Sequence, residues 1–219
     1  MRSVPPSDDA RLRIRAAALA LFGAQGVAAT SVRAIAAAAR VSPALVIHHY
    51  GSKEALQRAC DDYVLGELMG RNADAIDNPD LGATIQQWIG DMDTFRPAFD
   101  YLARIILDGT DDGLRLWDGL VDRTEAMITA GVAAGAMRDS ADPRMRAIII
   151  AAYGLVPLLL ERHIGRALGE IGLTADAVRR MTLPTLDLYT HGLYATTDVI
   201  DAARAALDGT ETPRKDDST

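Results

Sequence analysis

The sequence has little of several features that would mark other classes of protein. It contains a single cysteine, Cys60, in 219 residues, so no disulfide bond can form within the chain. We interpret Cys60 as a small core residue and not as a redox sensor. Aromatic residues make up only 5% of the chain, yet 49% of it is hydrophobic, which suffices for a globular core and excludes a disordered protein. A cytoplasmic location fits this cysteine usage.

Long hydrophobic runs are also missing. The longest, residues 147–160, is shorter than the roughly 20 residues that cross a bilayer, and Pro157 interrupts it. Residues 1–9 are polar and contain two prolines, which is unlike the apolar core of a signal peptide. We therefore expect no membrane association, and residues 147–160 are predicted to form a buried helix.

Charge is distributed unevenly along the chain. The net charge of −7 argues against a nucleic-acid binder, but residues 1–60 carry eight Lys or Arg against three acids. The remaining residues carry 15 Lys or Arg against 27 acids. Only the N-terminal part, with a net charge of +5, is therefore suited to face phosphates.

Alternation typical of strands is absent, and apolar residues recur at helical spacing almost throughout, which predicts an all-α protein. A turn is expected at residues 108–113, and Pro97 is expected to interrupt a helix that starts near residue 81 and resumes over residues 99–107. The other predicted helices are 8–24, 31–39, 43–50, 52–75, 114–137, 143–168, 174–194 and 198–207.

Residues 30–56 contain two short helix signals and the start of a third. Ser42 is a natural N-cap, and Pro43 suits the first helical position because the N–H that proline lacks would be unpaired there. The segment before it, residues 31–39, has one apolar face. A helix, a turn of about three residues and a second short helix are therefore predicted, and Tyr50-Gly51 ends the second one.

This order of residues resembles the DNA-binding segment of the tetracycline-repressor (TetR) family. The matching features are Thr30 and Ser31 at a helix start, Ile35-Ala36, Ala39, Val41-Ser42, His49-Tyr50 and Ser52-Lys53-Glu54-Ala55-Leu56. In that family a three-helix helix-turn-helix head binds double-stranded DNA, and a larger helical body binds a small ligand and pairs two subunits. The resemblance implies a head at residues 1–55, a body at 56–208 and a disordered polar tail at 209–219.

The chain departs from the family pattern at several positions. Arg40 stands where the turn usually has glycine, so an unusual backbone conformation or a shifted turn is expected. Ile47 replaces a tyrosine that contacts the DNA backbone in many members. Pro43, Ala44 and Leu45 occupy positions that often carry polar residues, so base reading is expected to rely on apolar contacts, for example with thymine methyl groups.

The resemblance implies a set of residues that contact DNA. Arg33 ranks first as a base reader, because an arginine at the matching position in the tetracycline repressor reads a guanine, and His48 ranks second. Lys53 lies at a helix N-terminus, which suits a phosphate, and hydroxyl groups and His49 are expected to add backbone contacts. The full set is Thr30, Ser31, Arg33, Ser42, Pro43, Ala44, Leu45, Ile47, His48, His49 and Lys53.

The body supplies large apolar side chains and a few polar ones that could line a pocket for a small, largely apolar effector. Ordinary core packing is the alternative for each of them singly, and the ligand is inferred mainly from the family. The candidates are Trp88, Met92, Phe95, Arg96, Tyr101, Trp117, Met127, Tyr153 and His163. Residues 143–168 and 174–194 are apolar around much of their circumference, which predicts a homodimer with a four-helix interface.

Other chemistries find little support. His48 and His49 are adjacent and point about 100° apart on a helix, so no metal site is expected, and no cofactor motif or pair of nucleophile and base is visible. The chain is therefore predicted to be a ligand-released repressor, not an enzyme. Two alternatives remain: a helical small-molecule or lipid-binding protein, or an enzyme, whose head has lost DNA binding, and an architectural DNA binder without a ligand.

Overall fold

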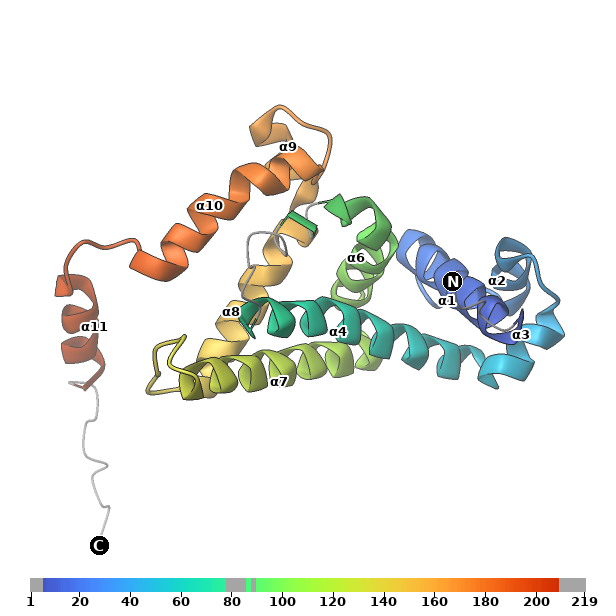
Figure 1. The fold of residues 1–219 in the computed structure, drawn as a ribbon, viewed down its shortest axis with the longest axis horizontal. Coiled ribbons are helices and arrows are strands. Elements are labelled where there is room, and N and C mark those ends of the chain that lie inside the picture. The colour runs from blue at the N-terminus through green and yellow to red at the C-terminus, as the bar shows by residue number, and fades with distance from the viewer. Residues whose placement is uncertain (1–5, 78–85, 88–89, 209–219) are drawn as a thin grey trace, which may run out of the picture. The chain divides into compact units, whose positions relative to one another are not determined.

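A computed structural model of the protein describes residues 6–77, 86–87 and 90–208 (Figure 1). All regular structure in these ranges is helical, which confirms the predicted all-α class. The ten helices described are α1 (Pro6–Gln25), α2 (Val32–Ala39), α3 (Pro43–Tyr50), α4 (Lys53–Asp77), α6 (Met92–Leu107), α7 (Asp111–Ala133), α8 (Pro143–Leu159), α9 (Glu161–Leu168), α10 (Ala175–His191) and α11 (Asp198–Asp208).

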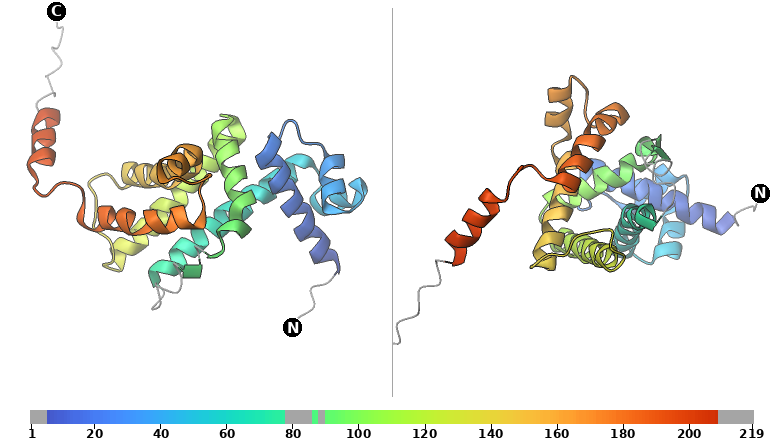
Figure 2. Two further views of the ribbon diagram at one scale, coloured as in Figure 1. Left: turned by 90° about the horizontal axis from the view of Figure 1, so that it is seen from above. Right: turned by 60° about the vertical axis from the view of Figure 1, so that its left-hand side comes forward.

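The chain forms two compact units, residues 1–175 and residues 176–219. In the first unit, α2 and α3 pack on α1, and α6 lies between α1 and α8 (Figures 1 and 2). The long helices α4 and α7 run side by side. Helix α4 therefore connects the head, residues 1–55, to the helices of the body that follow it.

One hydrophobic core extends through the head and the body without a break. Helix α1 contributes Ile14, Ala18, Leu19 and Phe22 to it, and Cys60 of α4 is fully buried in it, as predicted. Its fully buried members include Ile14 and Phe22 of α1, Ile35 of α2, Val46 of α3, Leu56 and Val64 of α4, Tyr101 of α6, Val121 of α7 and Ala147 of α8. The predicted domain boundary near residue 55 coincides with no gap in this core.

Helix α7 begins earlier than predicted, because Thr110 acts as its N-cap. The Thr110 hydroxyl accepts a hydrogen bond of 3.3 Å from the Gly113 N–H, and Asp111 and Asp112 place negative charge in the first turn, where the helix dipole favours it. The prediction of a turn through residue 113 was wrong in its second half. Gly113 has no room for a β-carbon, which would collide with the Ile105 carbonyl oxygen of α6.

Pro97 does not interrupt α6, contrary to prediction. It is the sixth residue of the helix, where its missing N–H removes only one backbone hydrogen bond and the neighbouring helices hold the chain in place. The part of the predicted helix that starts near residue 81 lies outside the described residues.

The predicted helix 143–168 is two helices, because the chain bends by 66° between α8 and α9. Pro157 deprives the last turn of α8 of one N–H donor, and α8 ends two residues later, at Leu159, with Leu160 as its C-cap. Glu161, the first residue of α9, forms an ion pair of 2.6 Å with Arg96 of α6. Within the described residues, no single helix has the length and apolarity of a membrane span, and α8 and α9 meet that test only when taken together.

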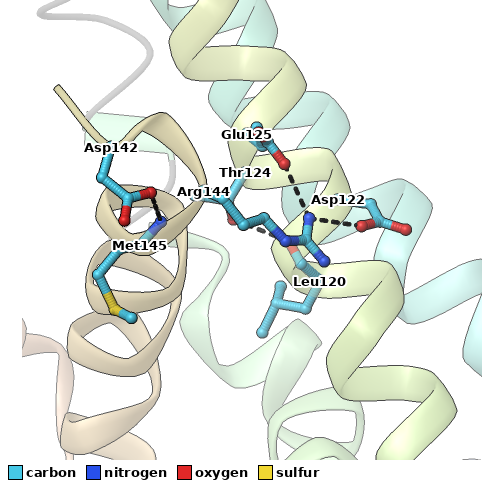
Figure 3. A network of polar contacts seen from close by, with 7 residues as sticks. All are labelled: Leu120, Asp122, Thr124, Glu125, Asp142, Arg144 and Met145. Carbon is cyan, nitrogen blue, oxygen red and sulfur yellow. Dashed lines mark hydrogen bonds and ion pairs between the residues drawn. The ribbon is translucent and has the colours of Figure 1, made fainter. Parts of the chain in front are cut away.

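A polar network joins α7 to the start of α8 (Figure 3). Arg144 Nη1 contacts Asp122 Oδ1 at 2.7 Å and Glu125 Oε2 at 2.8 Å, and both acids lie on α7. Asp142 caps α8 by accepting a hydrogen bond of 2.9 Å from the Met145 N–H, as its position before Pro143 predicts.

The second unit contains α11 and nearly all of α10. Both helices lie within a few residues of their predicted positions. Their large apolar side chains are mainly exposed, among them Leu183, Leu186, Tyr189, Val199 and Ile200. The predicted disordered tail, residues 209–219, lies outside the described residues.

Candidate nucleic-acid interface

Helix α2 is fixed by its cap and by its apolar face. The Ser31 hydroxyl accepts a hydrogen bond of 3.1 Å from the Ala34 N–H, and Ile35, Ala36 and Ala39 are buried. Arg33 is exposed, and its side chain makes no hydrogen bond or ion pair within the described part of the chain. Its guanidinium group is therefore available to a ligand.

The turn between α2 and α3 contains a residue in the left-handed conformation, which is the first of the two predicted alternatives, an unusual backbone conformation or a shifted turn. Arg40 has φ 55° and ψ 49°, its N–H donates to the Ala37 carbonyl oxygen at 3.2 Å, and the Val41 N–H donates to the Ala36 carbonyl oxygen at 2.9 Å. These bonds complete the C-terminal turn of α2. A residue other than glycine in this conformation costs about 1 kcal/mol. The arginine side chain is exposed in the turn that leads to α3.

Helix α3 presents a mainly apolar surface to solvent. Its start is capped by Ser42, whose hydroxyl accepts a hydrogen bond of 3.2 Å from the Leu45 N–H. Val46 is the one fully buried side chain of the helix, whereas Ile47 is 43% exposed and His48 is exposed. A helix of eight residues cannot hold this surface in place without its neighbours.

Helix α1 supplies the contacts that hold α2 and α3. The Tyr50 hydroxyl at the end of α3 donates a hydrogen bond of 2.8 Å to the Arg11 carbonyl oxygen, and the Arg11 guanidinium group lies 5.5 Å from the centre of the Tyr50 ring. Partial burial raises the pKa of Tyr50, so the hydroxyl stays protonated as a donor. Arg13 Nε donates to the Ala39 carbonyl oxygen at 3.3 Å, at the C-terminal end of α2.

Lys53 is engaged inside the protein. Its Nζ donates to the carbonyl oxygens of Val27 and Thr30, at 3.0 and 3.1 Å. The ammonium group thereby ties the start of α4 to the loop before α2, so most of its hydrogen-bonding capacity is used. These bonds give Lys53 a positioning role in the head, and the phosphate contact predicted for it stays a prediction.

Thr30 is also directed inward, against the prediction. Its side chain is 1% exposed. The Thr30 hydroxyl donates to the Gly26 carbonyl oxygen at 2.7 Å, and Thr30 Oγ1 accepts a hydrogen bond of 3.1 Å from Gln25 Nε2. A buried hydroxyl with both bonding directions satisfied is not free for a phosphate. Thr30 therefore braces the loop between α1 and α2.

The remaining predicted DNA contacts share one region of α2 and α3. Ser31, Arg33, Ser42, Pro43, Ala44, Ile47 and His48 are exposed, and Leu45 and His49 are half-buried. Arg40 is also exposed in this region, although the sequence analysis considered only its backbone conformation. Its position between two short helices was the available signal.

The histidine pair does not assemble a metal site. The rings of His48 and His49 lie with their centres 5.5 Å apart and their planes at 66°. In the described ranges, no group of three or more His, Cys, Asp or Glu residues is placed to hold a metal ion. Apolar side chains, the exposed imidazole of His48 and the half-buried one of His49 are what α3 offers to a partner.

Those predicted ligand residues whose side chains the structure describes do not gather around one site. Phe95 and Tyr101 are buried in the core, Trp117 and Met127 are half-buried against it, and Tyr153 is 56% exposed on α8. Trp88 and the side chain of Met92 lie outside the described residues. Only Arg96 and His163 line a described cavity.

That cavity is a cleft of about 440 Å³ between α1, α6 and the bend from α8 to α9. Helix α1 contributes only the small residues Ala20, Gly23 and Ala24 to it. Sequence reasoning missed the cleft, because α1 and α9 are far apart in the chain and no local pattern links them.

Comparison with known proteins supports the family resemblance over most of the chain. Residues 14–60 match the family profile "Bacterial regulatory proteins, tetR family", and residues 93–195 match "Tetracyclin repressor-like, C-terminal domain". The HTH-type transcriptional regulatory protein RaaS of Mycobacterium tuberculosis is 38% identical over 187 residues, which cover 85% of this chain and 87% of that protein.

Solved structures agree on the fold. GusR of Salmonella enterica superposes with a TM-score of 0.54 at 20% identity, covering 82% of this chain and 96% of its own. FadR of Bacillus subtilis, in complex with stearoyl-CoA, superposes with a TM-score of 0.54 at 15% identity and covers 84% and 99%. The two profile matches and the 38% identity to RaaS show that the chain, with its helix-turn-helix head and helical body, belongs to the TetR family of DNA-binding transcriptional regulators.

Proposed function

We propose that the chain is a homodimeric repressor that binds a palindromic operator in the cytoplasm and leaves it when a small, largely apolar effector binds. The observation that carries operator binding is the exposed surface of α2 and α3, where Arg33, Arg40 and His48 stand beside an apolar Ile47. Arginine suits guanine or phosphate, and apolar side chains suit thymine methyl groups. Membership of a family of non-enzymatic regulators excludes the enzymatic alternative.

Within this surface, Arg33 is assigned to base reading. It is exposed in the first turn of α2, opposite the buried face of that helix, so its side chain can extend without breaking an interaction of the head. Arg40, on the turn, is assigned to a phosphate. A base contact changes sequence preference, whereas a phosphate contact changes mainly the salt dependence of binding.

The proposed dimer is supported by an exposed apolar stripe on α8. Met145, Ile149, Tyr153, Val156 and Leu160 are each at least 40% exposed, and their spacing of three or four residues places them on one face of the helix. Taken by itself, α10 carries exposed Leu183, Leu186 and Tyr189. Two copies of these helices would bury the apolar area and place two recognition helices roughly 34 Å apart, one turn of DNA.

DNA binding is tested by fluorescence anisotropy with labelled duplexes from the regions flanking the chain's own gene, at several salt concentrations. Arg33→Ala is expected to weaken specific binding about tenfold or more, which corresponds to the lower part of the range for a bidentate base contact. Arg123→Ala is the matched control, because Arg123 is an exposed arginine of α7 and its loss changes the net charge equally. Equal effects of the two variants would contradict the assigned surface.

The effector is tested by a thermal-shift screen of small molecules, followed by anisotropy in the presence of those that stabilise the protein. A repressor of the proposed kind requires a stabilising molecule that also lowers operator affinity. Operator binding without any such molecule would favour the alternative, an architectural DNA binder.

A further inference from the structure

The cleft between α1, α6 and the bend from α8 to α9 has the size and lining of a small-molecule site. Its volume of about 440 Å³ falls within the range of roughly 300–1,000 Å³ that such sites occupy. Its floor is apolar and comes from Phe99 and Ala103 of α6 together with Leu158 and Leu159 of α8. An occupant with a hydrophobic part would remove this surface from water.

The rim of the cleft carries more positive than negative charge. Arg96 is shared between Asp100 at 2.7 Å and Glu161 at 2.6 Å, so its charge is compensated. Arg162 and His163 line the same cleft and are exposed, and their side chains make no ion pair or hydrogen bond with the described residues. A free guanidinium group beside an apolar floor selects a ligand with an acidic group.

The other wall of the cleft belongs to the DNA-binding head. Ala20 and Ala24 of α1 are exposed there, while Gly23 between them lies against α6 so closely that a β-carbon would stand 2.9 Å from the Tyr101 backbone nitrogen. The two helices are in close contact at this crossing and cannot approach each other further. A molecule inserted beside it cannot be accommodated by a closer approach of α1 to α6.

We propose that this cleft binds an amphipathic organic anion, with its acidic group at Arg162 and His163 and its apolar part between α1 and α6, and that the occupant changes the position of the head. This inference rests on the proposed function, since it names the site and chemical class of the effector. The ligand touches the head directly and needs no relay through the rest of the body.

Binding is measured by calorimetry on the full chain without DNA, which separates it from any failure of operator binding. The probes are decanoate and 2-naphthoate below their aggregation limits, each compared with its uncharged counterpart, 1-decanol and 2-naphthalenemethanol. At least one acid is expected to bind at least tenfold more tightly than its alcohol. Absence of binding by both acids, or equal binding of acids and alcohols, overturns the proposed ligand class.

The site is located with variants. Arg162→Ala is expected to weaken binding of the acid about tenfold, whereas Arg166→Ala, which removes an exposed arginine of the same helix outside the cleft, is expected to leave it unchanged. Ala24→Trp fills the cleft from the head side and should abolish binding. Because Arg162→Ala changes only a surface side chain, it remains informative if the tryptophan variant is unstable. Equal binding to all these variants overturns the location.

The effect on the head is measured by anisotropy with the operator duplex found for the parent protein. A saturating acid is expected to lower operator affinity at least fivefold in the parent protein and in Arg166→Ala, and not in Ala24→Trp. Binding of the acid in the cleft without a change in operator affinity overturns the proposed coupling. Failure of the acid-free protein to bind any duplex overturns the proposed repressor instead, and leaves the calorimetric result standing.

Discussion

The Tyr101 hydroxyl of α6 donates a hydrogen bond of 2.5 Å to Oδ1 of Asp61 on α4, and the Tyr101 ring lies 6.1 Å from the ring of Phe22 on α1. Three helices thus meet at one buried tyrosine. Burial raises the pKa of Asp61 from 3.8 to about 6, although the hydrogen bond from Tyr101 opposes the shift.

The raised pKa of Asp61 makes stability depend on pH. Between about pH 4 and pH 6 the Asp61 carboxyl is protonated in the folded protein and ionised in the unfolded chain. The stability that this protonation contributes is lost as the pH rises through 6. Asp61→Asn keeps an oxygen that can accept from Tyr101. It should raise the free energy of unfolding by about 1 kcal/mol at pH 7.5, after discounting for partial exposure, and by less at pH 5.5.

Urea unfolding at the two pH values measures this difference. Asp62→Asn is the control, because Asp62 is the exposed neighbour on the same helix, and its effect should be small. A gain for Asp61→Asn that is the same at both pH values would contradict the assigned cause.

Gly23→Ala is expected to destabilise the protein despite the better helix propensity of alanine. The new β-carbon would stand 2.9 Å from the Tyr101 nitrogen, which forces α1 and α6 apart and costs about 1–3 kcal/mol. Gly66→Ala in α4 meets nothing within 4 Å and should stabilise by about 0.5–1 kcal/mol. Thermal unfolding of both variants measures these changes in stability. Changes of the same sign for the two variants would argue against close packing of α1 on α6 at Gly23.

Arg40→Gly is expected to change folding stability and operator affinity in opposite directions. Glycine adopts the left-handed conformation at no steric cost, so folding should gain up to about 1 kcal/mol. Operator affinity should fall because a phosphate contact is lost. The slope of the logarithm of affinity against the logarithm of salt concentration should decrease in magnitude by about one. Arg40→Lys retains the charge and should preserve the salt dependence. Unchanged DNA binding by Arg40→Gly would remove Arg40 from the interface.

Lys53→Met is expected to act on stability more than on DNA. It leaves the carbonyl oxygens of Val27 and Thr30 without their donor, at a cost of about 1–3 kcal/mol, which thermal unfolding of the full chain would register. Its effect on the salt dependence of operator binding should be smaller than that of Arg40→Gly. The opposite pattern, with intact stability and a reduced salt dependence, would restore the phosphate contact predicted from sequence.

Tyr153→Glu is expected to weaken the homodimer, because it places a charge in the middle of the apolar stripe on α8. Analytical ultracentrifugation should find at least a tenfold rise in the dissociation constant. Leu114→Glu is the control, since Leu114 is 58% exposed on α7 and lies outside the stripe. A monomeric parent protein, or equal behaviour of both variants, would contradict the proposed interface.

Local signals in the sequence predicted the head well. The pair Ser42-Pro43 sets the start of α3 through a cap and a preset backbone angle, and both effects act within one turn of helix. Asp142-Pro143 does the same for α8. Such features need no knowledge of the surrounding fold.

Polar residues whose partners are distant in sequence were predicted less well. Lys53 was assigned to a phosphate because it lies at a helix start, but its carbonyl partners are 23 and 26 residues away. The bend at Leu160 was missed although Pro157 gave a local signal, because a continuous apolar run obscured it. The cleft could not be predicted, since its walls come from helices that meet only in the folded chain.

The unbroken core from Ile14 through Tyr101 to Val121 has a consequence for engineering and for evolution. A head grafted onto an unrelated body would expose the apolar side of α1 and separate Phe22 from Tyr101, so we expect that the helix-turn-helix of this chain cannot be transferred by itself. Because the head and the body share one core, a substitution that changes operator preference is also expected to change the effector response, and the reverse.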